Sequence, residues 1–356
     1  MFAKFYSGKT ALVTGHTGFK GAWLSLWLRV LGAEVHGFAL APHTPPNFHE
    51  TLTPGTFASE TIGDIGEFKL VNQTIGDTRP DIVFHLAAQP LVRRSYDVPL
   101  ETATTNILGT AHVLEALRQN EIDCPVVVVT SDKCYENNST ARAFTEDDPL
   151  GGHDIYSASK AAVEIMTRSW QRAFKGRIAT ARAGNVIGGG DYGVDRILPD
   201  CVRALETSEP IVVRSPASTR PWQHVLDCLS GYLWLGARLA EDEGCATAFN
   251  FGPESEDQRP VCELVEHFLQ HWPGEWNDGS DPNAPYEAAT LSLATDKARQ
   301  QLGWQPVWDF ATAVHLAARW YHQRHVVKFE DIHGLSLAQL EAFISDAVEK
   351  RVSWAG

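Results

Sequence analysis

Two ionisable residues of opposite charge, Asp132 and Lys133, stand side by side in the stretch TSDKCYENNS at residues 130–139. They directly follow CPVVVVT, a β-branched apolar run that predicts a buried central strand. An acid and a base that leave the end of a strand together can reach neighbouring atoms of one bound molecule, where one gives a proton and the other takes one. The competing interpretation is a surface ion pair, which contributes little to stability.

A second feature that carries chemistry is the stretch VTGHTGFKGAW, which places Gly15, Gly18 and Gly21 between a predicted strand and a predicted helix. Glycines at this spacing allow a tight turn and a close approach of the backbone to a pyrophosphate, while the helix N-terminus offers unpaired N–H groups to the anion. A purely structural turn is the alternative. The order of strand, turn and helix favours a dinucleotide site.

The identity of that dinucleotide stays open on the residues alone. An acid about 20 residues after the glycines usually holds the ribose hydroxyls of NAD, yet the second predicted strand ends in GFALAPHT, residues 37–44, without one. No Arg or Lys stands there to meet the 2′-phosphate of NADP either.

The stretch YSASK places Tyr156 and Lys160 four residues apart on a predicted helix that runs to about Phe174, so both side chains share one face. A free phenol has a pKa of about 10, and a nearby ammonium is expected to lower it. The pair could then take a proton from a sugar hydroxyl as a hydride leaves its carbon for a nicotinamide. The same spacing occurs on ordinary solvated helices, but the glycine turn upstream favours the catalytic interpretation.

Alternating strands and helices position these residues. Apolar runs at 10–15, 34–40, 81–88, 125–131 and 177–188 predict strands, and segments 21–32, 101–120 and 157–174 predict helices. This alternation predicts an α/β fold with a doubly wound parallel sheet and right-handed crossovers. We expect a dinucleotide-binding domain at residues 1–182, with strands returning from later segments, and a smaller mixed α/β substrate-binding part at 183–356.

Composition limits the partners of the chain. Its 356 residues carry a net charge of −14, which argues against a nucleic-acid partner. No stretch is long and apolar enough to span a membrane and no signal peptide is visible, so the sequence predicts a cytoplasmic protein. The six cysteines lie far apart without a CxxC pair, which predicts reduced core thiols and no metal site.

Several motifs together resemble the extended short-chain dehydrogenase/reductase superfamily over essentially the whole chain. They are TGHTGFKG, GDI at 63–65, HLAAQ at 85–89, Asn106 in TNILGT, the YxxxK pair and RAGNVIGGGD. Within that superfamily the chain is most similar to the nucleotide-sugar 4,6-dehydratases, and among these to the branch that acts on CDP-glucose. The stretches that carry this finer resemblance are GHTGFKGAWLSLWL, SDKCYEN, GNVIGGGDYGVDRILPD and TRPWQHVLDCLSGYL.

The resemblance implies a lyase with a Rossmann fold and a role for each member of the acid–base group. Ser131 would hydrogen-bond the sugar O4 beside Tyr156, Asp132 would protonate the departing C6 hydroxyl, and Lys133 occupies the place of the base that removes the C5 proton. Lys133 could instead order a water or stabilise the enolate while another group takes the proton. The alternative functions are a 4,6-dehydratase acting on another nucleotide sugar, a nucleotide-sugar epimerase and a non-catalytic dinucleotide sensor. An epimerase has no use for the Asp132 and Lys133 pair, and a sensor has no use for Ser131, Tyr156 and Lys160.

The resemblance also implies NAD that stays tightly bound and is recycled, CDP-glucose as the substrate, and a homodimer built on the helices at about 101–119 and 156–174. The residues implied at the cofactor are Gly15, Thr17, Gly18, Phe19, Lys20, Gly21, Asp64, Ile65, Ala87, Ala88, Gln89, Asn106, Thr130, Tyr156 and Lys160. Those implied at the substrate are Asn185, Arg196, Arg220 and His224. An Arg fork suits a diphosphate, although each Arg could equally form a loop salt bridge.

Overall fold

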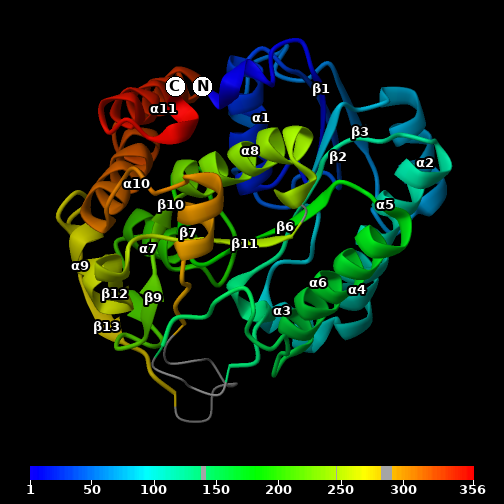
Figure 1. Cartoon of the computed structure of the whole chain (residues 1–356). Helices are drawn as coiled ribbons and strands as arrows, with labels where there is room; N and C mark the ends of the chain where they lie inside the picture. The colour runs from blue at the N-terminus through cyan, green and yellow to red at the C-terminus, as the bar shows by residue number, and fades with distance from the viewer. Residues whose placement is uncertain (138–141, 246, 282–290) are drawn as a thin grey trace.

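A seven-stranded parallel sheet forms the centre of the computed structural model, which describes residues 1–137, 142–245, 247–281 and 291–356 (Figure 1). The strand order is β11-β6-β5-β4-β1-β2-β3. The strands are β1 Thr10–Thr14, β2 Glu34–Ala39, β3 Ser59–Ile62, β4 Ile82–His85, β5 Val126–Val129, β6 Ile178–Ala183 and β11 Ala248–Phe251. The predicted doubly wound fold is therefore confirmed.

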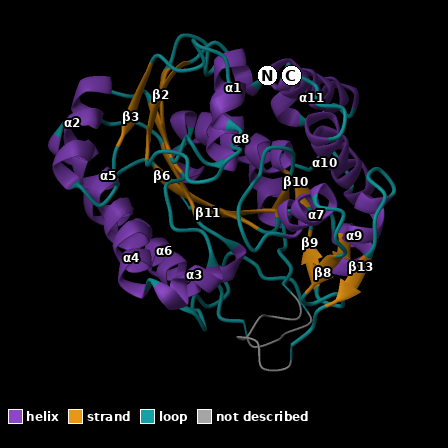
Figure 2. Ribbon diagram, turned by 180° about the vertical axis from the view of Figure 1, so that it is seen from behind, coloured by secondary structure: helices purple, strands orange, loops and turns teal. Residues whose placement is uncertain are grey.

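Side chains that alternate along the strands divide the core into two layers. Ala11 and Val13 of β1 pack with helices α1 (Phe19–Val30) and α8 (Val225–Glu241), whereas Leu12 packs on the opposite face. That face is covered by α2 (Phe68–Thr78), α5 (Gly109–Gln119) and α6 (Ile155–Phe174), as Figure 2 shows from behind. Because both faces are covered, the strands read as continuous apolar runs.

The sequence did not predict β3. Its residues Ser59–Ile62 form an exposed edge strand without an apolar run, so hydrophobic patterning gives no signal there. The strand that ends at the acid–base pair is consequently the fifth along the chain. At the opposite edge, β11 returns from beyond residue 182 and pairs with β6, from Ala248 opposite Thr180 to Phe251 opposite Ala183.

The helix predicted over 101–120 is interrupted. Short helices α3 (Val92–Asp97) and α4 (Pro99–Ala103) lead into a π-helical turn at Thr104–Leu108, and α5 follows it. Such turns often occur at functional sites. Here the turn carries Asn106, whose side chain points away from solvent.

The C-terminal part is smaller and mixed. Its helices are α7 Ile197–Glu206, α9 Val261–Leu269, α10 Phe310–His325 and α11 Ile332–Glu349; its strands pair two by two and are β7 Val186–Ile187, β8 Ile211–Val213, β9 Thr219–Pro221, β10 Gln223–His224, β12 Gln258–Pro260 and β13 Trp276–Asp278. Within the described ranges no helix has the length and apolar character needed to cross a membrane. All six cysteines are free thiols, and five of them are buried.

Candidate active site

The acid–base pair lies on a single 3₁₀ turn, Asp132–Cys134, at the carboxyl end of β5. Ser131 caps this turn, because its Oγ accepts a hydrogen bond from the Lys133 N–H at 3.2 Å and donates one to Asp132 Oδ1 at 2.9 Å. Asp132 is only 3% exposed, and its Oδ2 has no hydrogen-bond partner among the described residues. Burial raises the pKa of the Asp132 carboxyl, against the opposing effects of Lys133, Ser131 and Arg220. This carboxyl is therefore suited to hold a proton and release it.

Helix α6 brings Tyr156 to the same cavity. The helix begins after Asp154, whose Oδ1 accepts the Ser157 N–H at 2.9 Å. Burial raises the pKa of Tyr156 to about 12, although a hydrogen bond with Ser131 opposes the rise. The expectation that Lys160 lowers this pKa is thus wrong for the chain alone, because desolvation of the phenolate outweighs the attraction of a nearby cation.

Lys160 lies beneath Tyr156, buried, and its Nζ donates to the Val129 carbonyl at 3.1 Å. Burial, with a contribution from the Lys20 ammonium, lowers the pKa of Lys160 to about 7. Near neutral pH this amine therefore exists in both protonation states, which suits a group that passes protons.

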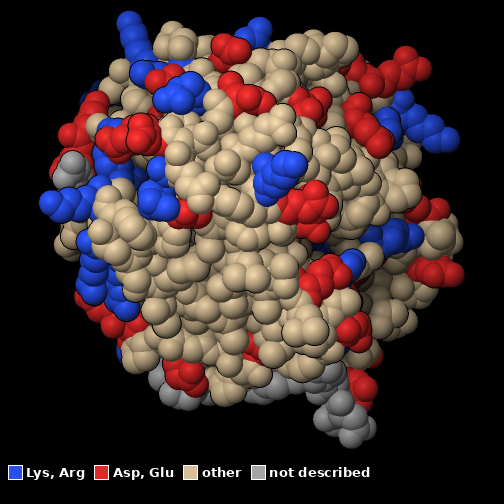
Figure 3. All heavy atoms as spheres, turned by 90° about the vertical axis from the view of Figure 1, so that its right-hand side faces the viewer, with Lys and Arg blue, Asp and Glu red and all other residues tan. Residues whose placement is uncertain are grey.

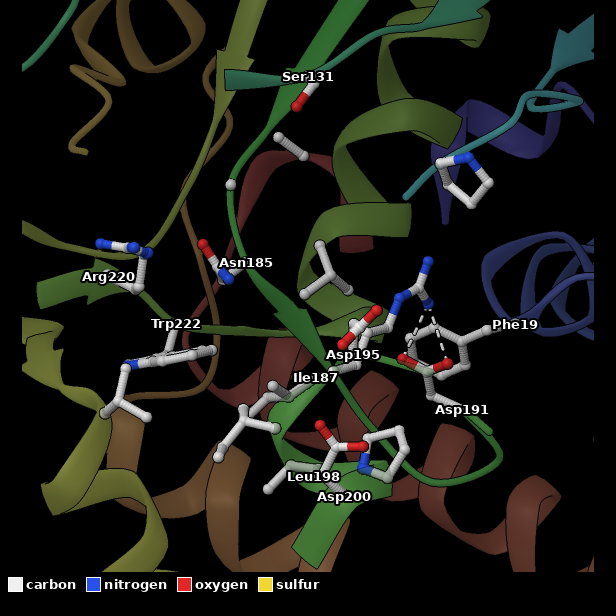
Figure 4. Close-up of a pocket in the computed structure, with 18 of the residues that line it drawn as sticks. Phe19, Ser131, Asn185, Ile187, Asp191, Asp195, Leu198, Asp200, Arg220 and Trp222 are labelled. Carbon is white, nitrogen blue, oxygen red and sulfur yellow. Dashed lines mark hydrogen bonds and ion pairs between the residues drawn. The ribbon is translucent and has the colours of Figure 1, made fainter. Parts of the chain in front are cut away.

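Around these residues lies a central cavity of about 290 Å³, drawn in Figure 4. Ser131, Asn185, Arg220 and Trp222 border one part of it, and Phe19, Asp191 and Asp195 border another. Arg220 is buried and its Nη1 donates to the Thr219 carbonyl at 3.0 Å. Arg196 donates to both carboxylate oxygens of Asp191 at 2.9 Å, drawn as dashed lines in the figure. The cavity is therefore bordered by guanidinium groups, which can bind an anionic ligand.

A second cavity, the glycine-turn cavity, adjoins the first and shares Phe19, Lys20, Pro90, Asp191 and Arg196 with it. Most of the predicted cofactor residues line it, namely Gly15, Thr17, Gly18, Gly21, Asp64, Ile65, Ala87 and Ala88. Thr130 lines the central cavity instead.

The glycine turn has the shape that a dinucleotide requires. A Cβ at Gly21 would lie 2.1 Å from the Gly15 carbonyl oxygen, and Gly15 itself has a φ of +76° with Ala87 N only 2.8 Å from its Cβ position. The turn is consequently packed directly against the loop after β4. The residues at the start of α1, from Gly18 to Gly21, line this cavity, and a helix N-terminus is a favourable place for a phosphate group. The residues present thus fit a dinucleotide pyrophosphate.

These cavities are not lined by four of the predicted site residues, namely Lys160, Gln89, Asn106 and His224. Asn106 and Gln89 are buried and bind each other, since the Gln89 N–H donates to Asn106 Oδ1 at 2.8 Å and Asn106 Nδ2 donates to the Gln89 carbonyl at 3.2 Å. They fix the loop that carries Ala87 and Ala88. His224 is fully buried and caps α8, where its Nδ1 accepts the Leu226 N–H at 3.2 Å.

Sequence reasoning missed several lining residues. Pro90 borders the central cavity, the glycine-turn cavity and a third cavity that Lys133 and Arg220 also line, and Asp191 fixes Arg196. The only signal for Asp191 was its place five residues before Arg196 in the glycine-rich stretch GGGDYG. The segment Leu40–Thr44 also lines the glycine-turn cavity, at the position where an acid was expected and is absent.

The structure also brings together three potential metal ligands that the sequence did not connect. Glu60 Oε1 lies 3.0 Å from His16 Nε2 and 2.5 Å from His49 Nε2. The 3.0 Å contact has the length of an ordinary N–H···O hydrogen bond, and the 2.5 Å contact is shorter than that range.

Comparison with known proteins supports the interpretation of this geometry. The sequence profile described as "NAD dependent epimerase/dehydratase family" matches residues 11–252. The chain is 40% identical to a CDP-glucose 4,6-dehydratase of Salmonella typhimurium over 96% of this chain and 98% of that protein. It is 26% identical to a dTDP-glucose 4,6-dehydratase of Xanthomonas campestris over 88% of this chain and 93% of that protein. A solved dTDP-glucose 4,6-dehydratase from Streptomyces venezuelae, 22% identical, superposes with a TM-score of 0.78 over 91% of this chain and 99% of that one, which shows the shared fold.

Proposed function

Since this chain belongs to the NAD dependent epimerase/dehydratase family, we propose that it is a 4,6-dehydratase that converts CDP-D-glucose to CDP-4-keto-6-deoxy-D-glucose. The observation that carries the proposal is the turn at the end of β5. It places a buried acid, Asp132, and a basic side chain, Lys133, on the cavity that Tyr156 also lines. An epimerase needs a proton acceptor at O4 but has no use for an acid and a base at C6 and C5.

Oxidation at C4 depends on α6. Tyr156 takes the proton from the C4 hydroxyl, with Ser131 hydrogen-bonded to the same oxygen. Lys160, whose pKa of about 7 leaves part of the population neutral, accepts that proton as it passes inward, and the proton then leaves to solvent because the product keeps its C4 ketone. NAD held at the glycine turn would supply the acceptor for the hydride that leaves C4 and the donor of the hydride that returns to C6.

Elimination depends on the turn after β5. The ketone at C4 makes the C5 proton acidic, and Lys133 removes it. Asp132, whose pKa is raised by burial, gives its proton to the C6 hydroxyl, which leaves as water. As the hydride returns to C6, Lys133 gives its proton back to C5, and the Asp132 carboxylate takes up a proton from solvent. The reaction therefore removes one water and involves no net redox change.

The diphosphate and the cofactor are assigned to the two adjoining cavities. Arg220 and Asn185 face the central cavity and bind the nucleotide sugar, while Arg196 is oriented by Asp191. The glycine turn holds the pyrophosphate of NAD, with Asp64 and Ile65 near adenine. Because no acid follows β2, the ribose contact differs from the usual one.

The test is to incubate the purified protein separately with CDP-glucose, dTDP-glucose, UDP-glucose and GDP-mannose, and to follow the alkali-induced absorbance of a 4-keto-6-deoxy product. We expect product from CDP-glucose alone. Product from another nucleotide would keep the reaction and change the substrate. No product from any of the four, with and without added NAD, would contradict the proposed function.

We also propose that the chain acts in the cytoplasm as a homodimer. Helix α4, the π-helical turn and α6 pack together and expose Leu100 (82%), Leu108 (51%) and Ile165 (48%) on their outer side. Figure 3 shows this face with few charged side chains across its centre. An apolar surface of this kind supports self-association through a two-fold axis.

A further inference from the structure

Glu164 is a buried carboxylate that the proposed mechanism does not use. It lies on α6, four residues after Lys160 and eight after Tyr156, and therefore on the same face of the helix. It is 4% exposed and points toward the ends of β5 and β6 rather than toward solvent. Glu164 therefore lies directly behind the residues assigned to catalysis, and its hydrogen-bond partners indicate its role.

Both oxygens of Glu164 accept hydrogen bonds, from the residue that follows β5 and from two residues of β6. Oε1 accepts the hydroxyl of Thr130, the residue before Ser131, in a short hydrogen bond. Oε2 accepts the Thr180 hydroxyl at 2.7 Å and Arg182 Nη2 at 2.8 Å. The Glu164 and Arg182 side chains are each only 3% exposed. A buried ion pair contributes little net stability compared with apolar residues of the same size, so stability alone does not explain this pair.

Arg182 continues the network to the far side of the catalytic turn. Its Nη1 donates to the Tyr135 hydroxyl at 2.7 Å, and its guanidinium stacks 4.8 Å from the centre of the Tyr135 ring. Tyr135 in turn donates to Asn250 Oδ1 at 2.6 Å, at the edge strand β11. Segment 130–135 is therefore held at its first residue by Glu164 and at its last residue by Arg182.

We propose that the Glu164–Arg182 ion pair is a positioning pair, which fixes the Ser131–Lys133 turn relative to Tyr156 and Lys160. Tyr156 and Lys160, assigned to C4 oxidation, lie on α6, whereas Ser131 and the two residues assigned to elimination lie on the turn after β5. Glu164 of the ion pair belongs to α6, and the pair binds Thr130 and Tyr135 on either side of that turn. A sugar bound in one orientation can then contact both the oxidation residues and the elimination residues. This inference rests on the proposed function and extends it.

The test compares Glu164→Gln and Tyr135→Phe with the wild-type chain, using CDP-glucose as the probe and measuring kcat, KM and thermal stability. Glu164→Gln keeps the size of the side chain and removes its charge. Tyr135→Phe removes only the hydroxyl that joins Arg182 to the turn, and it keeps the test decisive if Glu164→Gln does not fold. Phe343→Leu, in the fully buried core of α11, serves as a destabilised control away from both cavities.

We expect kcat to fall about 10- to 100-fold in Glu164→Gln, and less in Tyr135→Phe, with KM within about twofold, because a small displacement of acid and base slows the chemistry more than it weakens binding. Deuterium exchange from solvent into C5 should fall in parallel. Phe343→Leu should lose stability and keep its kcat. A kcat unchanged in a folded Glu164→Gln or Tyr135→Phe, beside an active wild type, would overturn the positioning role alone. An inactive wild type would instead contradict the proposed function.

Discussion

Asp132 tests the residue-scale assignment most directly. Asp132→Asn keeps the shape of the side chain and the hydrogen bond from Ser131 but removes the proton that C6 requires. We expect product formation to slow about 10²- to 10⁴-fold, while deuterium still exchanges from solvent into C5. In the wild type, activity should fall as pH rises through the raised pKa of Asp132, because the acid is then lost. Unchanged turnover in Asp132→Asn would show that another group protonates the leaving hydroxyl.

Lys133 provides an independent test of the C5 step. If it is the base, Lys133→Met should still oxidise C4 but lose deuterium exchange at C5, measured by mass spectrometry of the recovered sugar. The control is Lys9→Met, at an exposed lysine that forms an ion pair with Asp81 just before β1. This variant should behave as the wild type. Exchange retained in Lys133→Met would assign to Lys133 the alternative role of stabilising the enolate.

Single site residues could be predicted from the sequence where they belong to a short continuous motif. The glycine turn, Ser131–Lys133 and the Tyr156–Lys160 pair all line or underlie one continuous site. His224 caps a helix and lines neither cavity, and a histidine that caps a helix and one that binds a ligand look alike in sequence. The direction of the Tyr156 pKa shift also required the structure, because burial decides it and Lys160 does not.

At the scale of elements, Asp227 joins the start of α8 to the loop before α10. Its carboxylate accepts the backbone N–H of Val307 at 2.5 Å and of Trp308 at 3.3 Å, and burial raises its pKa to about 7. A carboxyl whose pKa is higher in the folded chain binds protons more tightly there. Its contribution to stability is therefore complete below the ordinary value of 3.8 and is lost as pH rises toward about 7.

We therefore expect the stability difference between wild type and Asp227→Asn to shift with pH. The wild type should lose stability relative to the variant as pH rises from about 4 to about 7, measured by urea unfolding. Comparing the two chains cancels the opposing contributions of His85 and His224, whose pKa values burial lowers to about 3 in both. A difference independent of pH would show that Asp227 is already ionised in the folded chain across this range.

Elements were predictable in proportion to their apolar burial. The strands β1, β4, β5 and β6 are buried along almost their whole length and were visible as apolar runs. The strand β3 was not visible in the sequence, because it has no buried apolar face and is formed by backbone pairing with β2. The π-helical turn at Thr104–Leu108 was read as ordinary helix, since its extra residue per turn leaves no mark in hydrophobic spacing.

At the scale of the whole molecule, the proposed dimer makes the last prediction. A helix face that exposes Leu100, Leu108 and Ile165 would be costly in water unless another surface covers it. In a two-fold dimer each substitution is present twice at the interface, so Leu108→Asp places two carboxylates in an apolar contact. We expect light scattering to show a dimer for the wild type and a monomer for Leu108→Asp, whereas Val348→Asp, at an exposed valine of α11, should remain dimeric. A monomeric wild type would contradict the dimer, and a dimeric Leu108→Asp would move the interface to another face.

Helix α6 carries Tyr156, Lys160 and Glu164 on its inner side and Ile165 on its outer side. A dimer at this face would therefore also stabilise the position of the helix on which the proposed oxidation depends.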